Sequence, residues 1–340
     1  MNATELVKQL LLTFNNGDKE SFLDSVRAYI EHEKRMNHTQ VVKELEKVLF
    51  DKNAEYKTFS ERRFKNIPAI PRDSEKGFPL LEVKQYDDNF EDLIIGDNVK
   101  CQLDQIIKEF KDADILATYG LSYKKKILLC GKPGTGKTYT VRIISSLLNI
   151  PLVYVRFDSI ISSYLGETAS NLRKVFDYVE QGTWIVLFDE FDIIGKNRDD
   201  IHEHGEIKRV VNNFLQMMDS FMGTSLLFAA TNHQYLLDSA IWRRFDDILF
   251  YELPEKEIRI KLFERYLKSM KRENNIDLTS IAERSEGLSP SDIKMVAEEA
   301  MKLSIIDSRS NLIGDNVFQA LEKFINREKL RKTPVEKLNE

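Results

Sequence analysis

The stretch Lys126-Ile-Leu-Leu-Cys-Gly-Lys-Pro-Gly-Thr-Gly-Lys-Thr138 decides the fold of this chain, because an apolar run leads directly into the pattern GxxxxGK[ST]. The glycines permit a tight loop whose backbone N–H groups point at phosphate oxygens. In such a loop Lys137 reaches the β and γ phosphates, and the Thr138 hydroxyl ligates Mg²⁺. Helical apolar spacing follows in residues 139–148. The stretch therefore predicts a strand, a loop and a helix that bind a nucleoside triphosphate. The predicted contacts are Pro133, Gly134, Thr135, Gly136, Lys137, Thr138 and Tyr139.

Two further apolar runs end in polar residues. Residues 184–188 lead into Asp189 and Glu190, and residues 226–231 lead into Asn232. We predict that Asp189 holds Mg²⁺ directly or through water, that Glu190 polarises the attacking water, and that Asn232 orients it. A strand that simply ends in a solvated acidic turn is the alternative for the acid pair. Beside the phosphate-binding pattern the catalytic interpretation is favoured, with ATP and Mg²⁺ as cofactors.

Two adjacent arginines, Arg243 and Arg244, precede another predicted strand. An arginine offered to a phosphate stabilises charge in the transition state and can come from a neighbouring subunit. A solvated surface pair is the usual reading of such a dipeptide. Next to the other motifs we favour a catalytic role, which the sequence does not assign to one of the two.

Predicted strands alternate with helical segments after residue 89, which indicates a parallel sheet flanked by helices, the α/β fold of P-loop NTPases. The strands are expected at 126–130, 151–156, 183–188, 225–230 and 248–253. Helical spacing at 3–14, 20–34 and 39–50 predicts a small N-terminal bundle, whereas Pro68, Pro71 and Pro79 interrupt regular structure before residue 89. The predicted domains are 1–58 (helical bundle), 59–88 (linker), 89–253 (large α/β domain), 254–328 (helical lid) and 329–340 (charged tail).

Composition narrows the function classes. The 340 residues carry a net charge of −5, which makes nucleic acid an unlikely main partner. Cys101 and Cys130 lack metal-ligand spacing and indicate a reduced thiol environment. No apolar stretch approaches the roughly 20 residues that span a bilayer. We therefore expect a cytoplasmic protein without a membrane span.

On these motifs, residues 88–328 resemble the ATPase module of the AAA family, close to katanin, valosin-containing-protein-type unfoldases and membrane-anchored AAA proteases. The resemblance implies that Ile95 and Gly96, within Asn89-Phe-Glu-Asp-Leu-Ile-Ile-Gly96, contact the adenine base. It also implies a lid contact from Gly287-Leu-Ser-Pro-Ser-Asp-Ile293, in which Ser291 stands where the family usually has Ala.

The resemblance further implies a hexameric ring whose central pore grips polypeptide through Tyr164, Leu165 and Gly166. A buried tyrosine in a tight turn is the alternative. Two function classes remain: an ATP-driven remodeller or unfoldase, and a nucleotide-gated regulatory or scaffolding ATPase that threads no chain. A DNA-acting ATPase is a weaker third. The sequence contains no HExxH or GxSxG, so degradation would need a separate protease or effector subunit.

Overall fold

The computed structural model divides the chain into two units, Met1–Ala69 and Ile70–Glu340. It describes residues 8, 12, 19–36, 67–73, 77–155, 160, 165–191, 204–237, 239–273, 276–307 and 311–332. In the first unit, helix α2 (Lys19–Arg35) falls where the second helix of the bundle is expected. The expected helices at 3–14 and 39–50 lie outside the described residues, apart from residues 8 and 12. The domain boundaries drawn from the sequence remain predictions.

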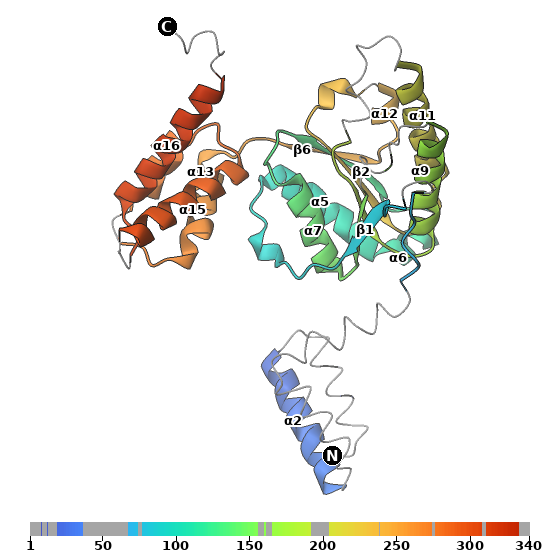
Figure 1. Cartoon of the computed structure of the whole chain (residues 1–340). Coiled ribbons are helices and arrows are strands. Elements are labelled where there is room, and N and C mark those ends of the chain that lie inside the picture. Colours follow the sequence, from blue (N-terminus) through green and yellow to red (C-terminus); the bar gives the residue numbers. More distant parts are fainter. Residues whose placement is uncertain are drawn as a thin grey trace. The chain divides into compact units, whose positions relative to one another are not determined.

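A six-stranded sheet with the order β1-β3-β4-β5-β2-β6 forms the centre of the second unit (Figure 1). Its strands are β1 (Leu81–Lys84), β2 (Lys126–Gly131), β3 (Leu152–Val155), β4 (Ile185–Phe188), β5 (Leu226–Thr231) and β6 (Asp247–Tyr251). Strands β2 to β6 are parallel, and β2 lies between β5 and β6. All residues of β4 and β5 are buried, as expected for parallel strands covered on both faces. The predicted α/β class is confirmed.

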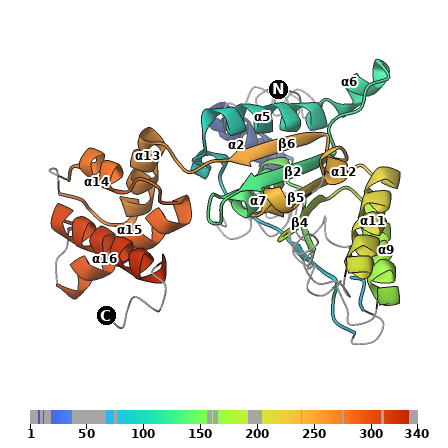
Figure 2. The same cartoon turned by 90° about the horizontal axis from the view of Figure 1, so that it is seen from above.

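Helices cover both faces of this sheet (Figure 2). On one face lie α5 (Asp97–Lys111) and α7 (Lys137–Leu148), which share a core with Ile127 and Leu129 of β2. On the other face lie α9 (Leu165–Glu180) and α11 (His204–Ser220). On that face, the ring centroid of Phe188 in β4 lies 5.8 Å from that of Phe176 and 5.1 Å from that of Phe214. Because side chains alternate along a strand, each strand supplies both cores.

The segment before the sheet contains a strand that the sequence reading missed. Prolines lead us to expect no regular element in residues 59–88, yet β1 pairs antiparallel with β3, with Leu81 opposite Val155. The strand begins after Pro79, so no ladder N–H is lost, and Leu81 is fully buried. Just upstream, the buried Asp73 carboxylate accepts a 2.8 Å hydrogen bond from Asn171 of α9. This segment is therefore packed onto the large domain.

Four helices follow the sheet: α13 (Lys256–Tyr266), α14 (Leu278–Arg284), α15 (Pro290–Ile306) and α16 (Gly314–Lys332). They enclose a core of their own that includes Leu262, Phe263 and Val296. A capping box between Ser289 and Asp292 starts α15, with Pro290 in its first turn. Proline suits this position because no intrahelical partner is lost there. The four helices lie in the segment in which the helical lid is expected, 254–328, although α16 continues to Lys332, and the bounds of the lid remain a prediction.

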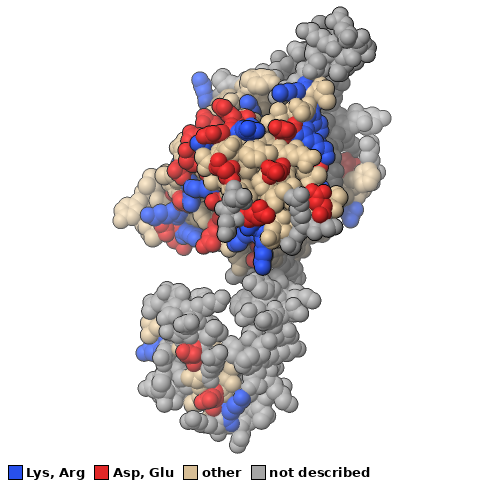
Figure 3. Space-filling view, turned by 90° about the vertical axis from the view of Figure 1, so that its left-hand side faces the viewer, with Lys and Arg blue, Asp and Glu red and all other residues tan. Residues whose placement is uncertain are grey.

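The remaining elements are short: α6 (Ala113–Thr118), α12 (Ser239–Trp242), and the 3₁₀ turns η1 (Phe90–Asp92), η2 (Gln234–Leu236) and η3 (Leu267–Ser269). Within the described part of the chain, no helix combines the length and the apolarity needed to cross a membrane. On the face of the second unit seen in Figure 3, basic and acidic side chains are interspersed, and the described residues there form no continuous basic stripe.

Candidate active site

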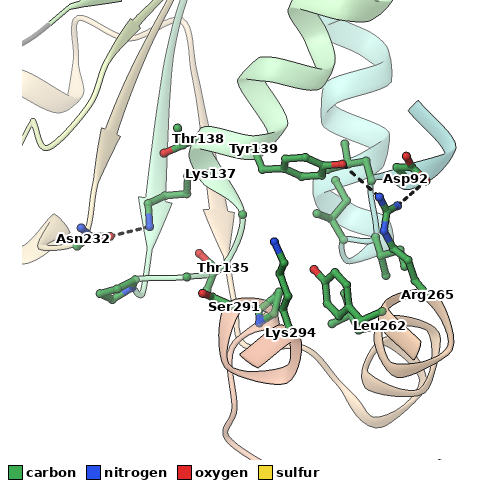
Figure 4. A pocket seen from close by; sticks show the side chains of 18 of the residues that line it. Asp92, Thr135, Lys137, Thr138, Tyr139, Asn232, Leu262, Arg265, Ser291 and Lys294 are labelled. Atoms are coloured by element: carbon green, nitrogen blue, oxygen red, sulfur yellow. Dashed lines mark hydrogen bonds and ion pairs between the residues drawn. The ribbon is translucent and has the colours of Figure 1, made fainter. Parts of the chain in front are cut away.

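A cavity of about 510 Å³ lies between the carboxyl edge of the sheet and the lid (Figure 4). It brings together most of the residues predicted from the sequence. These are Ile95, Pro133, Gly134, Thr135, Gly136, Lys137, Thr138, Tyr139, Asp189, Glu190, Asn232 and Ser291. Gly96 does not line this cavity; it caps the start of α5 and lines a neighbouring one. Tyr164 lies outside the described residues, and α9 begins at Leu165 and Gly166.

Lys137 is the first residue of α7 and is 6% exposed. Gly136 precedes it with φ 102°, a left-handed conformation that turns the loop into the helix and that side chains disfavour. The Lys137 ammonium donates to the carbonyl oxygens of Gly131 (2.8 Å) and Lys132 (2.9 Å), and to Oδ1 of Asn232 (2.8 Å). These contacts hold a positive charge at the base of the cavity, between the ends of β2 and β5.

A hydroxyl and a carboxylate meet at the end of β4. Thr138 donates to Oδ2 of Asp189 at 2.8 Å, and the Tyr154 hydroxyl lies 3.4 Å from the same oxygen. Burial, together with the nearby Asp189 charge, raises the pKa of Tyr154 to about 12, so its hydroxyl stays protonated at neutral pH. Among the described residues, no group of three or more acidic, His or Cys side chains could hold a metal. One hydroxyl and one carboxylate fit Mg²⁺, which takes its other ligands from phosphates and water.

Glu190 has an unusual backbone conformation, with φ 53°. A non-glycine residue in this region stores strain of about 1–2 kcal/mol, and such residues cluster at functional sites. Its N–H donates to Oδ1 of Asp189 at 2.9 Å, and the next N–H, of Phe191, donates to the carbonyl oxygen of Ala230. The turn thus directs an exposed carboxylate into the cavity beside Asp189, where it can accept a proton from a water.

The lid closes the other side of the cavity. The Ser291 N–H donates to the Gly134 carbonyl oxygen at 3.1 Å. Gly134 has φ 76°, and a Cβ added there would lie 2.7 Å from Oγ of Ser289. The phosphate-binding loop and the start of α15 are therefore in direct contact.

Eight residues of this lining were not predicted as site residues from the sequence: Asp92, Leu93, Ile94, Leu262, Arg265, Tyr266, Pro290 and Lys294. Three of them lie on α13 with the spacing i, i+3, i+4, which places them on one helix face. That spacing is visible in the sequence, but many surface helices share it, so it identified no site. Lys294 of α15 points into the cavity (Figure 4).

Neither Arg243 nor Arg244 lines the cavity of its own subunit. Arg243 is exposed, and Nε of Arg244 donates to Oδ2 of Asp219 on α11 at 3.1 Å. Arg243 or Arg244 could therefore reach a nucleotide only in the cavity of another copy of the chain.

Comparison with known proteins shows the family to which the chain belongs. The family model for "ATPase family associated with various cellular activities (AAA)" matches residues 127–253. Over 322 residues the chain is 35% identical to an uncharacterized AAA family ATPase of Sinorhizobium fredii, and the match covers 94% of each protein. This chain belongs to the AAA family of ATPases. Hydrolysis of ATP is the general activity of the family, so the AAA chain is an enzyme.

Two other relatives of this AAA ATPase are longer proteins. It is 34% identical over 228 residues to a proteasome-activating nucleotidase of Saccharolobus solfataricus, covering 65% of this chain and 58% of the relative. It is 29% identical over 258 residues to the ATP-dependent zinc metalloprotease FtsH 2 of Petrotoga mobilis, covering 73% of this chain and 41% of the relative. The AAA ATPase thus spans about half the length of these two proteins.

Proposed function

We propose that this AAA ATPase is a ring-forming protein remodeller, hexameric by family analogy, which uses ATP hydrolysis to pull on polypeptide. In this proposal Lys137, Thr138 and Asp189 hold Mg²⁺ and the phosphates. Glu190 activates the attacking water, and Arg243 or Arg244 acts on a neighbouring subunit's nucleotide. The N-terminal bundle selects a substrate or partner, and a separate protease or effector receives the product.

One observation carries the remodelling part of this proposal. Leu165 and Gly166 of the sequence Tyr164-Leu165-Gly166 begin α9, in a chain whose cavity is lined by most of the predicted ATP-binding residues. An aromatic ring and an aliphatic chain can wedge against an extended backbone without requiring a particular sequence. Support also comes from the names of two relatives, a nucleotidase that activates the proteasome and an ATP-dependent zinc metalloprotease.

The test measures ATPase activity and protein unfolding together. The full chain is mixed with a fluorescent protein that carries an unstructured tail, and loss of fluorescence is followed in the presence of a trap for unfolded protein. We expect Tyr164→Ala to keep ATPase activity and thermal stability but to lose unfolding. Tyr119→Ala, at a tyrosine that is 78% exposed and is not part of the cavity lining, is the matched control and retains both activities.

Two results would reject the proposal. Full unfolding activity in Tyr164→Ala would exclude threading through this loop. A loss of about 3–5 kcal/mol of stability in that variant would show that the ring is part of the core. A wild-type chain that hydrolyses ATP but unfolds nothing, with or without a co-purifying partner, would favour the regulatory or scaffolding class.

A further inference from the structure

Three residues of α13 line the cavity, Leu262, Arg265 and Tyr266, and of these only Arg265 is charged. Its Nη1 lies 2.8 Å from Oδ1 of Asp92, and its Nη2 donates to the Tyr139 hydroxyl at 3.3 Å (Figure 4). The two acceptors belong to different elements, the end of η1 and the first turn of α7. A planar guanidinium can serve both at once, which a lysine ammonium on a single stem does less well.

The Tyr139 acceptor is held in place by contacts within the large domain. The Tyr139 ring has the Arg142 guanidinium 5.5 Å from its centroid, and Arg142 in turn pairs with Asp88 at 2.9 Å and lies 4.3 Å from the Tyr86 ring centroid. Burial raises the pKa of Tyr139, so its hydroxyl remains neutral near pH 7. Arg265 therefore docks against a tyrosine that other contacts already order, and little further entropy is lost at that side chain.

The contacts of Arg265 with Asp92 and Tyr139 affect nucleotide binding because of where Arg265 lies on α13. Leu262 and Tyr266 lie on the same helix and line the cavity, as do Ile94 and Ile95. Figure 4 shows Leu262 and Arg265 on the side of the cavity away from Lys137, which we call its apolar end. The phosphates belong at the opposite, polar end, which Lys137 and Thr138 define. The base of the nucleotide must therefore lie at the apolar end, against α13.

We propose that Arg265 is a positioning residue, which fixes α13 over the cavity so that Leu262 and Tyr266 are presented to the base of ATP. It acts on nucleotide affinity and leaves the chemical step unchanged. Because α13 is already held in place, it loses less conformational freedom when the nucleotide binds. The inference concerns ATP binding alone, so it stands or fails independently of the remodelling activity proposed above.

The experiment compares full-length variants by steady-state ATPase kinetics and by calorimetry with a non-hydrolysable ATP analogue. We expect Arg265→Met to raise KM and Kd for the nucleotide about five- to tenfold, which corresponds to about 1–1.4 kcal/mol. The value of kcat stays within about twofold, because the variant weakens binding of the ground state and of the transition state equally. Asp92→Asn weakens binding in the same direction, and adding it to Arg265→Met has little further effect.

Two controls separate positioning from other roles. Arg284→Met removes a lid arginine that pairs with Glu322 and lies outside the cavity lining, and leaves all constants unchanged. Inorganic tripolyphosphate, which has no base, competes equally well for wild type and for Arg265→Met. Arg265→Lys restores part of the affinity through Asp92.

Three outcomes overturn the inference. Unchanged ATP affinity in Arg265→Met shows that the docking of α13 does not matter for binding. An equal loss of tripolyphosphate binding shows that Arg265 acts on the phosphates themselves. A lower kcat with an unchanged KM places its effect in the chemical step.

Discussion

The Thr138 hydroxyl donates a 2.8 Å hydrogen bond to Oδ2 of Asp189, which joins the first turn of α7 to the end of β4. The two groups come from motifs about 50 residues apart in the sequence, and the parallel sheet brings them together at one edge. Replacement of Asp189 by Asn keeps the shape of the side chain and removes its charge.

We therefore expect Asp189→Asn to need a higher Mg²⁺ concentration for half-maximal ATPase activity, because a neutral amide is a weaker Mg²⁺ ligand than a carboxylate. A Mg²⁺ titration of the ATPase rate at fixed ATP measures the shift. Asp177→Asn, on the exposed side of α9, is the control and leaves the titration unchanged. The same Mg²⁺ requirement in both variants would exclude Asp189 as a metal-site residue.

Glu190→Gln should stop turnover while ATP binding persists, because the amide cannot take a proton from water. The expected loss of kcat is about 10²–10⁴-fold, the range for removing a general base. Calorimetry measures binding and phosphate release measures turnover, with Glu286→Gln on the lid surface as the control. Near-normal hydrolysis would contradict the assignment of Glu190 as the base.

Arg244→Ala should retain ATP affinity and lose hydrolysis, because Arg244 lies outside its own cavity and pairs with Asp219. A transition-state arginine supplied by another subunit contributes about 10³–10⁵-fold in kcat. Mixing Arg244→Ala with Lys137→Ala tests the arrangement, since each variant alone is inactive and mixed rings contain some complete sites. Recovery of activity on mixing is the expected result. If Arg243→Ala shows this behaviour and Arg244→Ala does not, the finger is Arg243.

The two cysteines should react with thiol reagents at very different rates. Cys101 is exposed, whereas Cys130 is buried in β2, and burial raises the pKa of its thiol to about 12. The thiolate is the reactive form, so almost none is present on Cys130 at pH 8. We expect one fast-reacting thiol in the folded protein and a second only after unfolding in guanidinium chloride. A Cys101→Ser variant that still reacts quickly would show that β2 opens readily.

The sequence allowed the sheet and most of the cavity to be predicted because the signals are local. Each of these patterns occupies only a few residues. They are the apolar runs that end at Asp189 and Asn232, and the glycine loop before Lys137. The wall made by Leu262 and Tyr266 could not be predicted in this way. It depends on how the lid packs against η1 and α7, and contacts between distant segments leave no local pattern. Strand β1 was missed because three prolines outweighed the short alternation Leu-Glu-Val-Lys.

The aromatic side chains that pack behind Asp189 and Glu190 have a consequence for an oligomeric ring of subunits. Phe191 directly follows Glu190, Phe245 directly follows Arg244, and their ring centroids are 6.1 Å apart, edge to face. Both rings are nearly inaccessible to solvent, and Phe191 also contacts Phe214. Closely packed phenylalanine side chains transmit a displacement to their neighbours rather than absorb it. In an oligomeric ring as proposed, Glu190 would serve one nucleotide and Arg244 the next, and the contact between Phe191 and Phe245 would link the two sites within each subunit.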